Sequence, residues 1–492
     1  MGKKSDRRPS SELDFDVIIV GAGISGINAA YRVKQQAPPG TRFTVFEGRD
    51  SIGGTWDLFR YPGIRSDSDI FTFGFSWNPW PNQTTLGMGH EIKDYMIQSA
   101  KAAGIDGQIR YQHKVTSANW IPAHSHWEVA VSVNNSEKPI IYRTRFMLLG
   151  TGYYDYERPL ETTIPGIKDF EGKVIHPQFW PEDYSYTNKE MVVIGSGATA
   201  VTIVPSVADK VKHVTMLQRS PTYIFPLPQY PKLTSFLFAL MPSRMAQLAN
   251  RLLWIIQGYL MIFACRTFPG VAKRLIRAVN KKLLPPDVPW DPHFKPRYNP
   301  WEQRLCASMD GDFFAALRSG KASVATDTIA KVTKDSIELD SGAVLRPDVI
   351  ITATGLKLKF AGGVQFSIDG KPMDPVQGFI WKSSMIQDLP NVVFCVGYEN
   401  ASWTLGADCA AHLLTRLMWE LRNNNATVVV PHLDHPENME VKPLLSLSAT
   451  YLKNINRALP KAGTGPWRPR THYTADLYAA KWGDIKTGLL IK

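Results

Sequence analysis

Cysteine is scarce in this sequence. Its 492 residues include four, which are Cys265, Cys306, Cys395 and Cys409. They form no C-x-x-C pair and no dense cluster, so the sequence indicates neither a disulfide framework nor a zinc site. The lack of C-x-x-C also disfavours a disulfide reductase. We therefore expect no bound metal and a reducing, cytoplasmic compartment.

A secretory signal is lacking as well. The first ten residues, MGKKSDRRPS, are polar and contain no apolar core, and Asp6 stands where a myristoylation signal has Ser or Thr. We interpret residues 1–13 as a disordered tail.

Apolar runs long enough to span a bilayer are not found either. The run Leu252–Cys265 has 14 residues, fewer than the ~17–25 that a spanning helix needs, and Gln257 and Gly258 interrupt it. The preferred interpretation is a buried helix that lines a substrate cavity. A membrane-facing helix, which would give peripheral membrane contact through residues 252–265, and a true span are the alternatives.

Acidic residues are fewer than basic residues in this sequence. Lys and Arg number 56 against 44 Asp and Glu, a net charge of +12, which favours anionic ligands such as phosphates or an acidic membrane surface. The basic residues are scattered rather than gathered on one helix, so nucleic acid is not an expected partner. The length and a hydrophobic content of 44% indicate two or three ordinary globular domains.

A strand, a glycine loop and a helix follow one another near the start of the chain. The apolar run Asp14–Val20 leads directly into GAGISG and then into the helix-like INAAYRV. Gly21 allows a tight turn, Gly23 lets a pyrophosphate approach the backbone, and Gly26 lets helix and strand pack closely. Free N–H groups at the start of the helix, together with the Ser25 hydroxyl, can bind the phosphate.

The next predicted strand, TRFTVFE, ends at Glu47, about twenty residues after the last glycine, where a carboxylate can accept hydrogen bonds from an adenosine ribose. The loop after it, GRDSIGGTWDLFRYPGIRSDSD, permits a second close backbone approach at Gly53 and Gly54. GGTW after a ribose-binding Glu is typical of FAD enzymes. Arg65 and Asp67 are functional candidates on this loop, with a surface ion pair as the alternative.

A second unit of the same kind begins at Glu190–Ile194, which enters GSGATA and the helix TAVTIVPSVA. Ala200 replaces the third glycine, a variant that this type of loop accepts. The following strand, HVTMLQRS, ends at Arg219 and Ser220 without a carboxylate. Arg219 offers a planar fork to a 2′-phosphate, so NADPH is predicted, with a structural salt bridge as the alternative.

The fold class expected is α/β, with two interleaved Rossmann-like dinucleotide-binding domains, one for FAD and one for NADPH, and a helical insertion in the NADPH domain. The expected divisions are residues 14–160 and 385–492 for the FAD domain, 161–184 for a linker, 185–225 and 322–384 for the NADPH domain, and 226–321 for the insertion that lines the substrate cavity.

The linker carries the pattern F-x-G-x-x-x-H-x-x-x-W-P from Phe170 to Pro181, including Gly172, His176 and Trp180. Between two dinucleotide loops, this pattern resembles the fingerprint of Baeyer–Villiger monooxygenases, within the class B flavoprotein monooxygenases. The likeness is nearest to the ethionamide-activating group. It rests on GGTWDLFRYPGIRSDSD, HPQFWPEDYSY, VVIGSGATAVTIVP, HVTMLQRSPTYI, YNPWEQRLC and NASWTL.

The resemblance implies that NADPH reduces FAD, that the reduced flavin takes up O₂, and that a C4a-peroxyflavin inserts one oxygen atom into a ketone, giving an ester or lactone. A flavin monooxygenase that oxidises sulfur or nitrogen centres is one alternative. A membrane-associated cofactor-binding protein without turnover is another.

The resemblance also implies site residues. Arg304 matches the arginine that stabilises the transition state, and Asp67 matches the carboxylate that orients it. The hinge histidine, His176, matches a residue that serves movement of the NADPH domain rather than a catalytic base. Gln303 stands where many ketone-oxidising relatives carry Lys. The implied FAD contacts are Ser25, Glu47, Thr55, Trp56, Asp57, Leu58, Asp67 and Val115, and they join Gly21, Gly23, Gly26 and Gly54 of the glycine-rich stretches. The implied NADP contacts are Arg65, Ser66, Asp67, Gly195, Ser196, Gly197, Ala198, Thr199, Ala200, Val201, Arg219 and Ser220.

Overall fold

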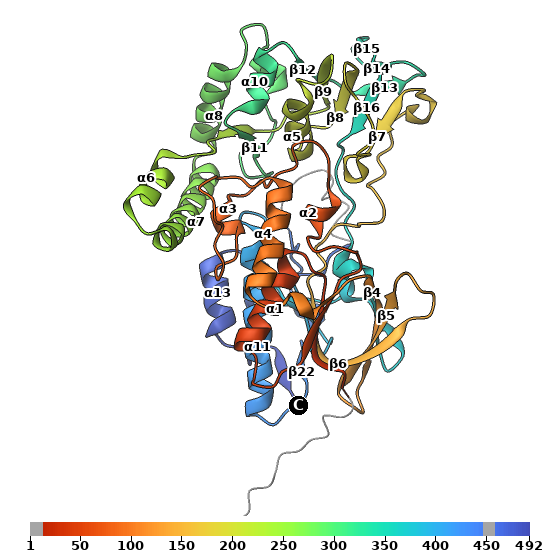
Figure 1. Ribbon diagram of the computed structural model, residues 1–492, viewed down its shortest axis with the longest axis vertical. Coiled ribbons are helices and arrows are strands. Elements are labelled where there is room, and N and C mark those ends of the chain that lie inside the picture. The colour runs from red at the N-terminus through yellow and green to blue at the C-terminus, as the bar shows by residue number, and fades with distance from the viewer. Residues whose placement is uncertain (1–12, 446–457) are drawn as a thin grey trace, which may run out of the picture.

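The structure is a computed structural model that describes residues 13–445 and 458–492. Apart from Leu13, the expected tail lies outside the described residues. Two α/β units are stacked along the long axis of the molecule, with the second glycine loop in the upper unit (Figure 1). The α/β class with parallel sheets, expected from the sequence, is confirmed.

The first unit is built on a nine-stranded sheet in the order β18-β17-β4-β5-β6-β1-β2-β3, with β21 paired to β6. Its centre is parallel and apolar, because helices α1 and α11 pack together along the core of this unit and the strands are buried. The antiparallel pairs β4–β5 and β5–β6 extend the sheet. The bounds are β1 Phe15–Val20, α1 Ile24–Gln36, β2 Phe43–Phe46, β3 Ile109–Arg110, β4 His113–Ile121, β5 His126–Val133, β6 Ile140–Leu149, β17 Gln365–Ile368, β18 Lys371–Met373, β21 Val392–Phe394 and α11 Trp403–Asn423.

The second unit is a five-stranded, fully parallel sheet in the order β12-β9-β8-β16-β7. Helices α5 and α10 pack against each other beside it, and the small antiparallel group β13-β14-β15 packs through a separate apolar cluster. The bounds are β7 Lys173–Ile175, β8 Glu190–Ile194, α5 Ala198–Val207, β9 His213–Gln218, α10 Asp312–Arg318, β12 Ala322–Thr326, β13 Ile329–Val332, β14 Ile337–Leu339, β15 Val344–Leu345 and β16 Val349–Thr352.

Both expected units of strand, glycine loop and helix are therefore present. β1 precedes GAGISG and α1, and β8 precedes GSGATA and α5. The chain returns to each sheet later in the sequence, since β16 pairs with β8 and β21 pairs with β6. Each glycine loop leaves the carboxyl end of a strand that has parallel neighbours on both sides, which is where such folds bind ligands.

Two expected boundaries differ from the structure. The linker includes β7, which pairs with β16 from Lys173 to Ile175, so part of it belongs to the second sheet. Residues 322–384 were expected in the second domain, but β17 and β18 lie in the first sheet. The reason is that β17 runs parallel to β4 and buries Phe366 in the core of the first unit.

The expected helical insertion, 226–321, is only partly helical. Helices α6 Lys232–Leu240, α7 Ser243–Thr267 and α8 Pro269–Leu283 form its first half. In its second half, β11 Cys306–Met309 pairs with β10 Ile224–Leu227, and α10 follows.

The preferred interpretation of the run Leu252–Cys265, a buried helix lining the cavity, is wrong. The run lies within α7, whose only buried residues are Ala246, Asn250, Ile262 and Cys265. By length and composition α7 could cross a membrane, and 17% of its most apolar window is buried within the protein. Many of its apolar side chains, including Leu248, Leu260 and Phe263, are exposed instead of packed into the protein core.

The remaining described elements connect and cover the two units. Short helices α2 and α3 lie in the loop region after β2, and α4 packs on α1 and α2. The bounds are α2 Thr55–Leu58, α3 Ile70–Phe73, α4 Gly89–Ala102, α9 Trp290–His293, β19 Ile380–Trp381, β20 Met385–Ile386, β22 Val429–Pro431, α13 Tyr473–Lys481 and β23 Leu489–Ile491.

Candidate functional site

A cavity of about 1190 Å³ lies between the two glycine loops. It exceeds the ~300–1,000 Å³ of an ordinary ligand pocket, so it has room for more than one ligand. Its walls come from both units: the GAGISG loop, the segment after β2 and the loop after β21 from the first, and the GSGATA loop and the end of β9 from the second.

The first glycine loop has the backbone that its sequence predicts. Gly21 adopts a φ of +99°, and a Cβ on Gly26 would lie 1.7 Å from the Gly21 carbonyl oxygen, so α1 packs too closely for any side chain there. At Gly23 the nearest atom to a Cβ would be 3.7 Å away. Gly23 lines the cavity, so the space above it is open to a ligand.

Glu47 stands directly after β2, where the ribose-binding carboxylate was predicted. Its Oε2 accepts a hydrogen bond from the Ala22 backbone N–H at 2.6 Å, and its Oε1 accepts one from the Arg49 N–H at 2.9 Å. Burial raises the pKa of Glu47, and these two hydrogen bonds offset part of that rise. The carboxylate therefore joins the first glycine loop to the next segment at the cavity wall.

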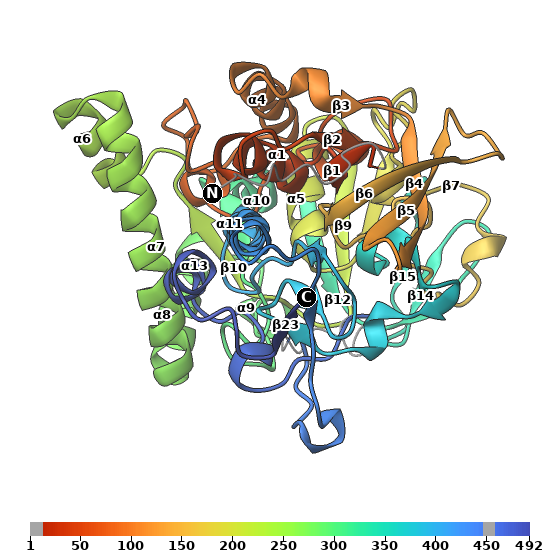
Figure 2. The ribbon, with the colours of Figure 1, turned by 90° about the horizontal axis from the view of Figure 1, so that it is seen from below.

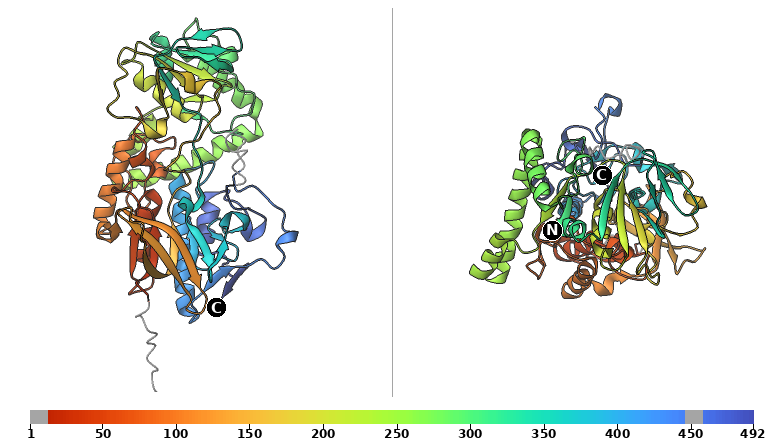
Figure 3. Two further views of the ribbon diagram at one scale, coloured as in Figure 1. Left: turned by 90° about the vertical axis from the view of Figure 1, so that its right-hand side faces the viewer. Right: turned by 90° about the horizontal axis from the view of Figure 1, so that it is seen from above.

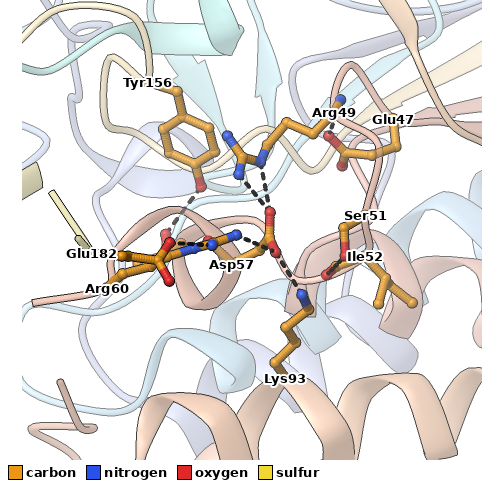
Figure 4. A network of polar contacts seen from close by, with 10 residues as sticks. Glu47, Arg49, Ser51, Ile52, Asp57, Arg60, Lys93, Tyr156 and Glu182 are labelled. Carbon is orange, nitrogen blue, oxygen red and sulfur yellow. Dashed lines mark hydrogen bonds and ion pairs between the residues drawn. The ribbon is translucent and has the colours of Figure 1, made fainter. Parts of the chain in front are cut away.

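Asp57 is the centre of a polar network beside this wall (Figure 4). Arg49 Nη2 lies 2.5 Å and Lys93 Nζ 2.6 Å from its carboxylate oxygens. Burial alone would raise the pKa of Asp57, but the hydrogen bonds from Lys93 and Arg49 lower it below the ordinary value. The network continues through Arg60, which pairs with Glu182 after the linker motif. Asp57 thus pairs with Arg49 and Lys93 instead of facing the cavity. Arg49 lines the cavity, whereas Asp57 does not.

The second glycine loop has the same division as the first between a tightly packed glycine and an open one. Gly195 has a φ of +135°, and a Cβ there would lie 2.2 Å from the Ala353 carbonyl oxygen. A Cβ on Gly197 would meet nothing within 4 Å, so this position also opens toward the cavity it lines. The Ser196 hydroxyl donates to the carbonyl of Ser220 at 2.9 Å and ties the loop to the end of β9.

Arg219 follows β9 and lines the cavity with an exposed side chain. Within residues 13–445 and 458–492 it makes no ion pair, so the structure does not bear out the alternative of a structural salt bridge. Its guanidinium is available to an anion at the mouth of the second glycine loop.

Charged groups from both units meet where the two units face each other. Arg65 is buried, and its Nη1 lies 2.5 Å from Oδ2 of Asp312 on α10, while its buried Nη2 has no hydrogen-bond partner among the described residues. Burial raises the pKa of Asp67, and the positive charges of Arg304 and Arg65 lower it in part. The surface ion pair considered for Arg65 and Asp67 is wrong, because Arg65 is buried and pairs with Asp312.

Arg304 reaches from the second unit to the first. Its Nε donates to the carbonyl of Glu399 at 2.8 Å, and its Nη2 donates to the carbonyl of Tyr398 at 2.9 Å. The hydrogen bonds that orient the guanidinium therefore come from backbone carbonyls after β21. Asp67 acts on Arg304 through its charge. Both side chains line the cavity.

Most of the predicted site residues do lie on the cavity wall. Five do not: Gly26 and Asp57 have the internal roles described above, Ala200 and Val201 are fully buried in the core of the second unit, and Leu58 packs against that core. The predicted residues that line the cavity are Gly21, Gly23, Ser25, Glu47, Gly54, Thr55, Trp56, Arg65, Ser66, Asp67, Val115, Gly195, Ser196, Gly197, Ala198, Thr199, Arg219, Ser220 and Arg304.

The prediction missed an aromatic wall. Tyr153 stacks on Trp403 with ring centroids 4.7 Å apart, and its hydroxyl lies 2.7 Å from that of Tyr154. Trp403 Nε1 donates to the Ser25 hydroxyl at 2.9 Å and so joins α11 to the first glycine loop. Trp403 belongs to the motif NASWTL and the two tyrosines to the stretch GTGYY at residues 150–154, but sequence spacing could not show that they meet.

The linker motif also reaches the cavity. His176 and Gln178 line it, and burial lowers the pKa of His176, which keeps the imidazole neutral near pH 7. Gln178 Nε2 donates to the carbonyl of Asp155 at 2.6 Å. Phe170 and Trp180 are buried in two different apolar clusters of the second unit and anchor the segment.

The fold and the site together define an oxidoreductase with two dinucleotide-binding units that share one cavity. Residues 15–232 match the family described as flavin-binding monooxygenase-like. The FAD-containing monooxygenase EthA of Mycobacterium tuberculosis is 41% identical over 474 residues, covering 96% of this chain and 96% of that protein. The probable FAD-binding monooxygenase AlmA of Acinetobacter sp. is 41% identical over 485 residues, covering 97% of this chain and 96% of that protein.

This chain belongs to the flavin-binding monooxygenase family, and the resemblance inferred from its motifs is confirmed. Among solved structures, OTEMO in complex with FAD and NADP matches with a TM-score of 0.72 at 19% identity, covering 98% of this chain and 100% of that chain. At that identity the match shows that the two proteins share a fold.

Proposed function

We propose that this protein uses FAD and NADPH to insert one atom of O₂ into a ketone, giving an ester or lactone. The observation that carries the proposal is the single cavity onto which both glycine loops open and into which Arg304 projects between the two units. Such an arrangement lets one bound nucleotide exchange electrons with the other beside a fixed positive charge.

The residues present fit both cofactors. Gly23 and Gly197 leave room for a pyrophosphate over the start of a helix, and Glu47 lies where a ribose hydroxyl would donate to it. Arg219, which makes no ion pair in the part of the chain that the structure describes, fits the 2′-phosphate that distinguishes NADPH from NADH. When bound, FAD supplies the redox chemistry that activates O₂ with electrons from NADPH.

Arg304 supplies a preorganised cation. Insertion of oxygen into a ketone places negative charge on the former carbonyl oxygen, and a donor held by two backbone carbonyls is already oriented before that charge develops. By analogy with oxyanion holes, one such donor contributes on the order of 2.7–4 kcal/mol. Asp67 and Asp312 balance the charges of Arg304 and Arg65 in the same region.

The test is the substitution Arg304→Ala in the FAD-loaded enzyme. We expect NADPH to reduce the flavin at the wild-type rate, while ester formation falls about 10²–10³-fold. Labelled ¹⁸O₂ and mass spectrometry of products from a panel of ketones would follow the oxygen atom, with Arg304→Lys as the conservative variant. If the alanine variant forms labelled ester at the wild-type rate, the catalytic charge lies elsewhere.

Oxidation of sulfur or nitrogen centres is the second candidate. It is favoured by the two hydrogen bonds that already engage Nε and Nη2 of Arg304, which leave less of the guanidinium for a substrate anion. Sulfide oxidation forms no anionic carbonyl adduct, so Arg304→Ala should spare it. A wild-type enzyme that oxidises thioanisole but no ketone would support this candidate and overturn the first.

A further inference from the structure

Helices α6, α7 and α8 form an arm along one side of the molecule. In Figure 2 and in the right-hand view of Figure 3 this green segment lies at the edge of the protein, apart from both sheets. None of its residues lines the cavity, so the proposed reaction does not account for this arm.

The outer face of α7 is an apolar stripe. Its exposed members recur three or four positions apart, which places them on one face of the helix. They are Met245 at 60% exposure, Leu248 at 69%, Leu252 at 58%, Ile256 at 46%, Leu260 at 61% and Phe263 at 62%. Exposed apolar side chains on α6 and α8 extend the surface, and they are Leu233, Phe236, Leu240, Val271 and Leu275.

The inner face of α7 is held to the protein by polar groups. Arg251 Nη1 donates to the carbonyls of Phe71 at 2.9 Å and Gly74 at 2.8 Å, and Gln247 Nε2 donates to the carbonyl of Trp80 at 3.0 Å. Apolar side chains of α7, among them Trp254 and Ile262, also pack on this inner side. The usual surface helix has only one apolar face, turned to the core, whereas α7 carries a second one on the outside. Contiguous exposed apolar surface of this kind marks an interaction site.

The charge of the arm is of one sign. Between residues 232 and 283 there is no Asp or Glu and there are nine Lys and Arg residues. Seven of the nine are exposed: Lys232, Arg244, Arg266, Arg274, Arg277, Lys281 and Lys282. The arm therefore combines an apolar stripe with cations that would meet an anionic surface.

We infer that this arm docks on an anionic lipid surface, with the apolar stripe in the headgroup and acyl boundary and the basic side chains among the headgroups. A spanning orientation would expose Arg251 and Gln247 to hydrocarbon and break their hydrogen bonds, so α7 lies along the surface. A second copy of this chain fits less well, because a symmetric pair would bring two acid-free basic arms together.

The docked arm would lie close to the cavity. Phe71 of α3 packs against Trp254 of α7 with ring centroids 6.3 Å apart, and Phe73 of the same short helix lines the cavity. One helix of four residues therefore separates the lipid-facing arm from the site. This placement suits an apolar substrate that partitions into the membrane.

The test is sedimentation of the FAD-loaded protein with vesicles of phosphatidylglycerol and phosphatidylcholine, or of phosphatidylcholine alone. We expect binding to the anionic vesicles and much weaker binding to the neutral ones. Leu248→Glu and Leu260→Glu should each lower the partition coefficient roughly tenfold or more, since each removes a buried leucine from the lipid. The pair Lys281→Glu and Lys282→Glu should reduce the preference for anionic lipid.

The matched control is Ile141→Glu, which changes an aliphatic residue of β6 at 50% exposure. In Figure 2 the strand β6 and the arm lie on different sides of the molecule. It should bind vesicles like the wild type. Flavin absorbance and NADPH oxidation should be unchanged in every variant and so report intact folding. Wild-type protein that stays in the supernatant with anionic vesicles would overturn the inference. So would a dimer in analytical ultracentrifugation that Leu248→Glu dissociates without any vesicle binding by the wild type.

Discussion

Arg219 is an exposed cation after β9 that has no ion-pair partner among the described residues, so its effect should appear in cofactor selection. We expect Arg219→Ala to raise the KM for NADPH about 10- to 100-fold, because a hydrogen bond to a charged group contributes about 1.5–3 kcal/mol. The KM for NADH should change little, since NADH lacks the 2′-phosphate. Steady-state oxidation of both cofactors measures the effect, with the exposed Arg158→Ala as control. Equal losses for both cofactors would contradict the assignment.

Asp57 should make the free energy of unfolding depend on pH in the acid range. Its folded pKa lies below the ordinary value of 3.8, so its stabilising effect is present above that pH and is lost as the pH falls through the folded pKa. We expect Asp57→Asn to lower the free energy of unfolding by about 1–3 kcal/mol near pH 7. The gap to wild type should narrow below about pH 4.

Urea denaturation of both proteins across this pH range checks the prediction. Asp287→Asn, which alters an exposed carboxylate, is the control and should behave as wild type throughout. A gap for Asp57→Asn that stays constant with pH would mean that the carboxylate charge is not what stabilises the network.

At the scale of elements, different glycines of the two loops serve different purposes: Gly26 is needed for packing and Gly197 for ligand binding. Gly26→Ala should push α1 from β1, because its Cβ would lie 1.7 Å from a backbone oxygen, and both folding and flavin content should fall. Gly197→Ala should leave the melting temperature unchanged, because its Cβ meets nothing within 4 Å and the backbone φ of −78° suits alanine. It should still raise the KM for NADPH by occupying the space above the loop.

Melting curves and NADPH kinetics of the two variants check this prediction side by side. A Gly197→Ala enzyme with wild-type affinity for NADPH would show that the pyrophosphate does not pass over this position. A Gly26→Ala protein of wild-type stability would contradict the packing argument instead.

The glycine loops were predictable because their constraints are local: each needs a buried strand, a turn and a helix within a short stretch. The orientation of α7 was not predictable, since its periodicity shows that one face is apolar but not whether that face meets the core or the solvent. The expectation that Asp57 contacts FAD differs from the structure for a related reason. A motif position does not reveal that Arg49 and Lys93 turn the carboxylate away from the cavity.

Distance along the chain limited the prediction of the site. The carbonyls that hold Arg304 belong to Tyr398 and Glu399, which are 94 and 95 residues away in sequence. The resemblance supplied the arginine and Asp67 as partners, but the backbone contacts depend on how the two units face each other. The same holds for Arg65 and Asp312, 247 residues apart.

At the scale of the whole molecule, the ion pair between Arg65 and Asp312 connects the two units. Arg65 comes from the loop after β2 and is 5% exposed, and Asp312 begins α10 of the second unit. Removing the carboxylate would leave the buried guanidinium without its ion-pair partner, with only the charge of Asp67, which it shares with Arg304, to balance it. Breaking one partner of a buried ion pair typically costs about 3–5 kcal/mol.

We therefore expect Asp312→Asn to lower the free energy of unfolding by about 3 kcal/mol and to loosen the two units relative to each other, which should split one unfolding transition into two. Asp335→Asn is the matched control, because its pair with Arg346 is exposed at 59% and 69%, and such pairs contribute about 0–1 kcal/mol. Calorimetry of both variants decides the matter. If they lose the same small amount of stability in a single transition, the contact between Arg65 and Asp312 does not couple the units.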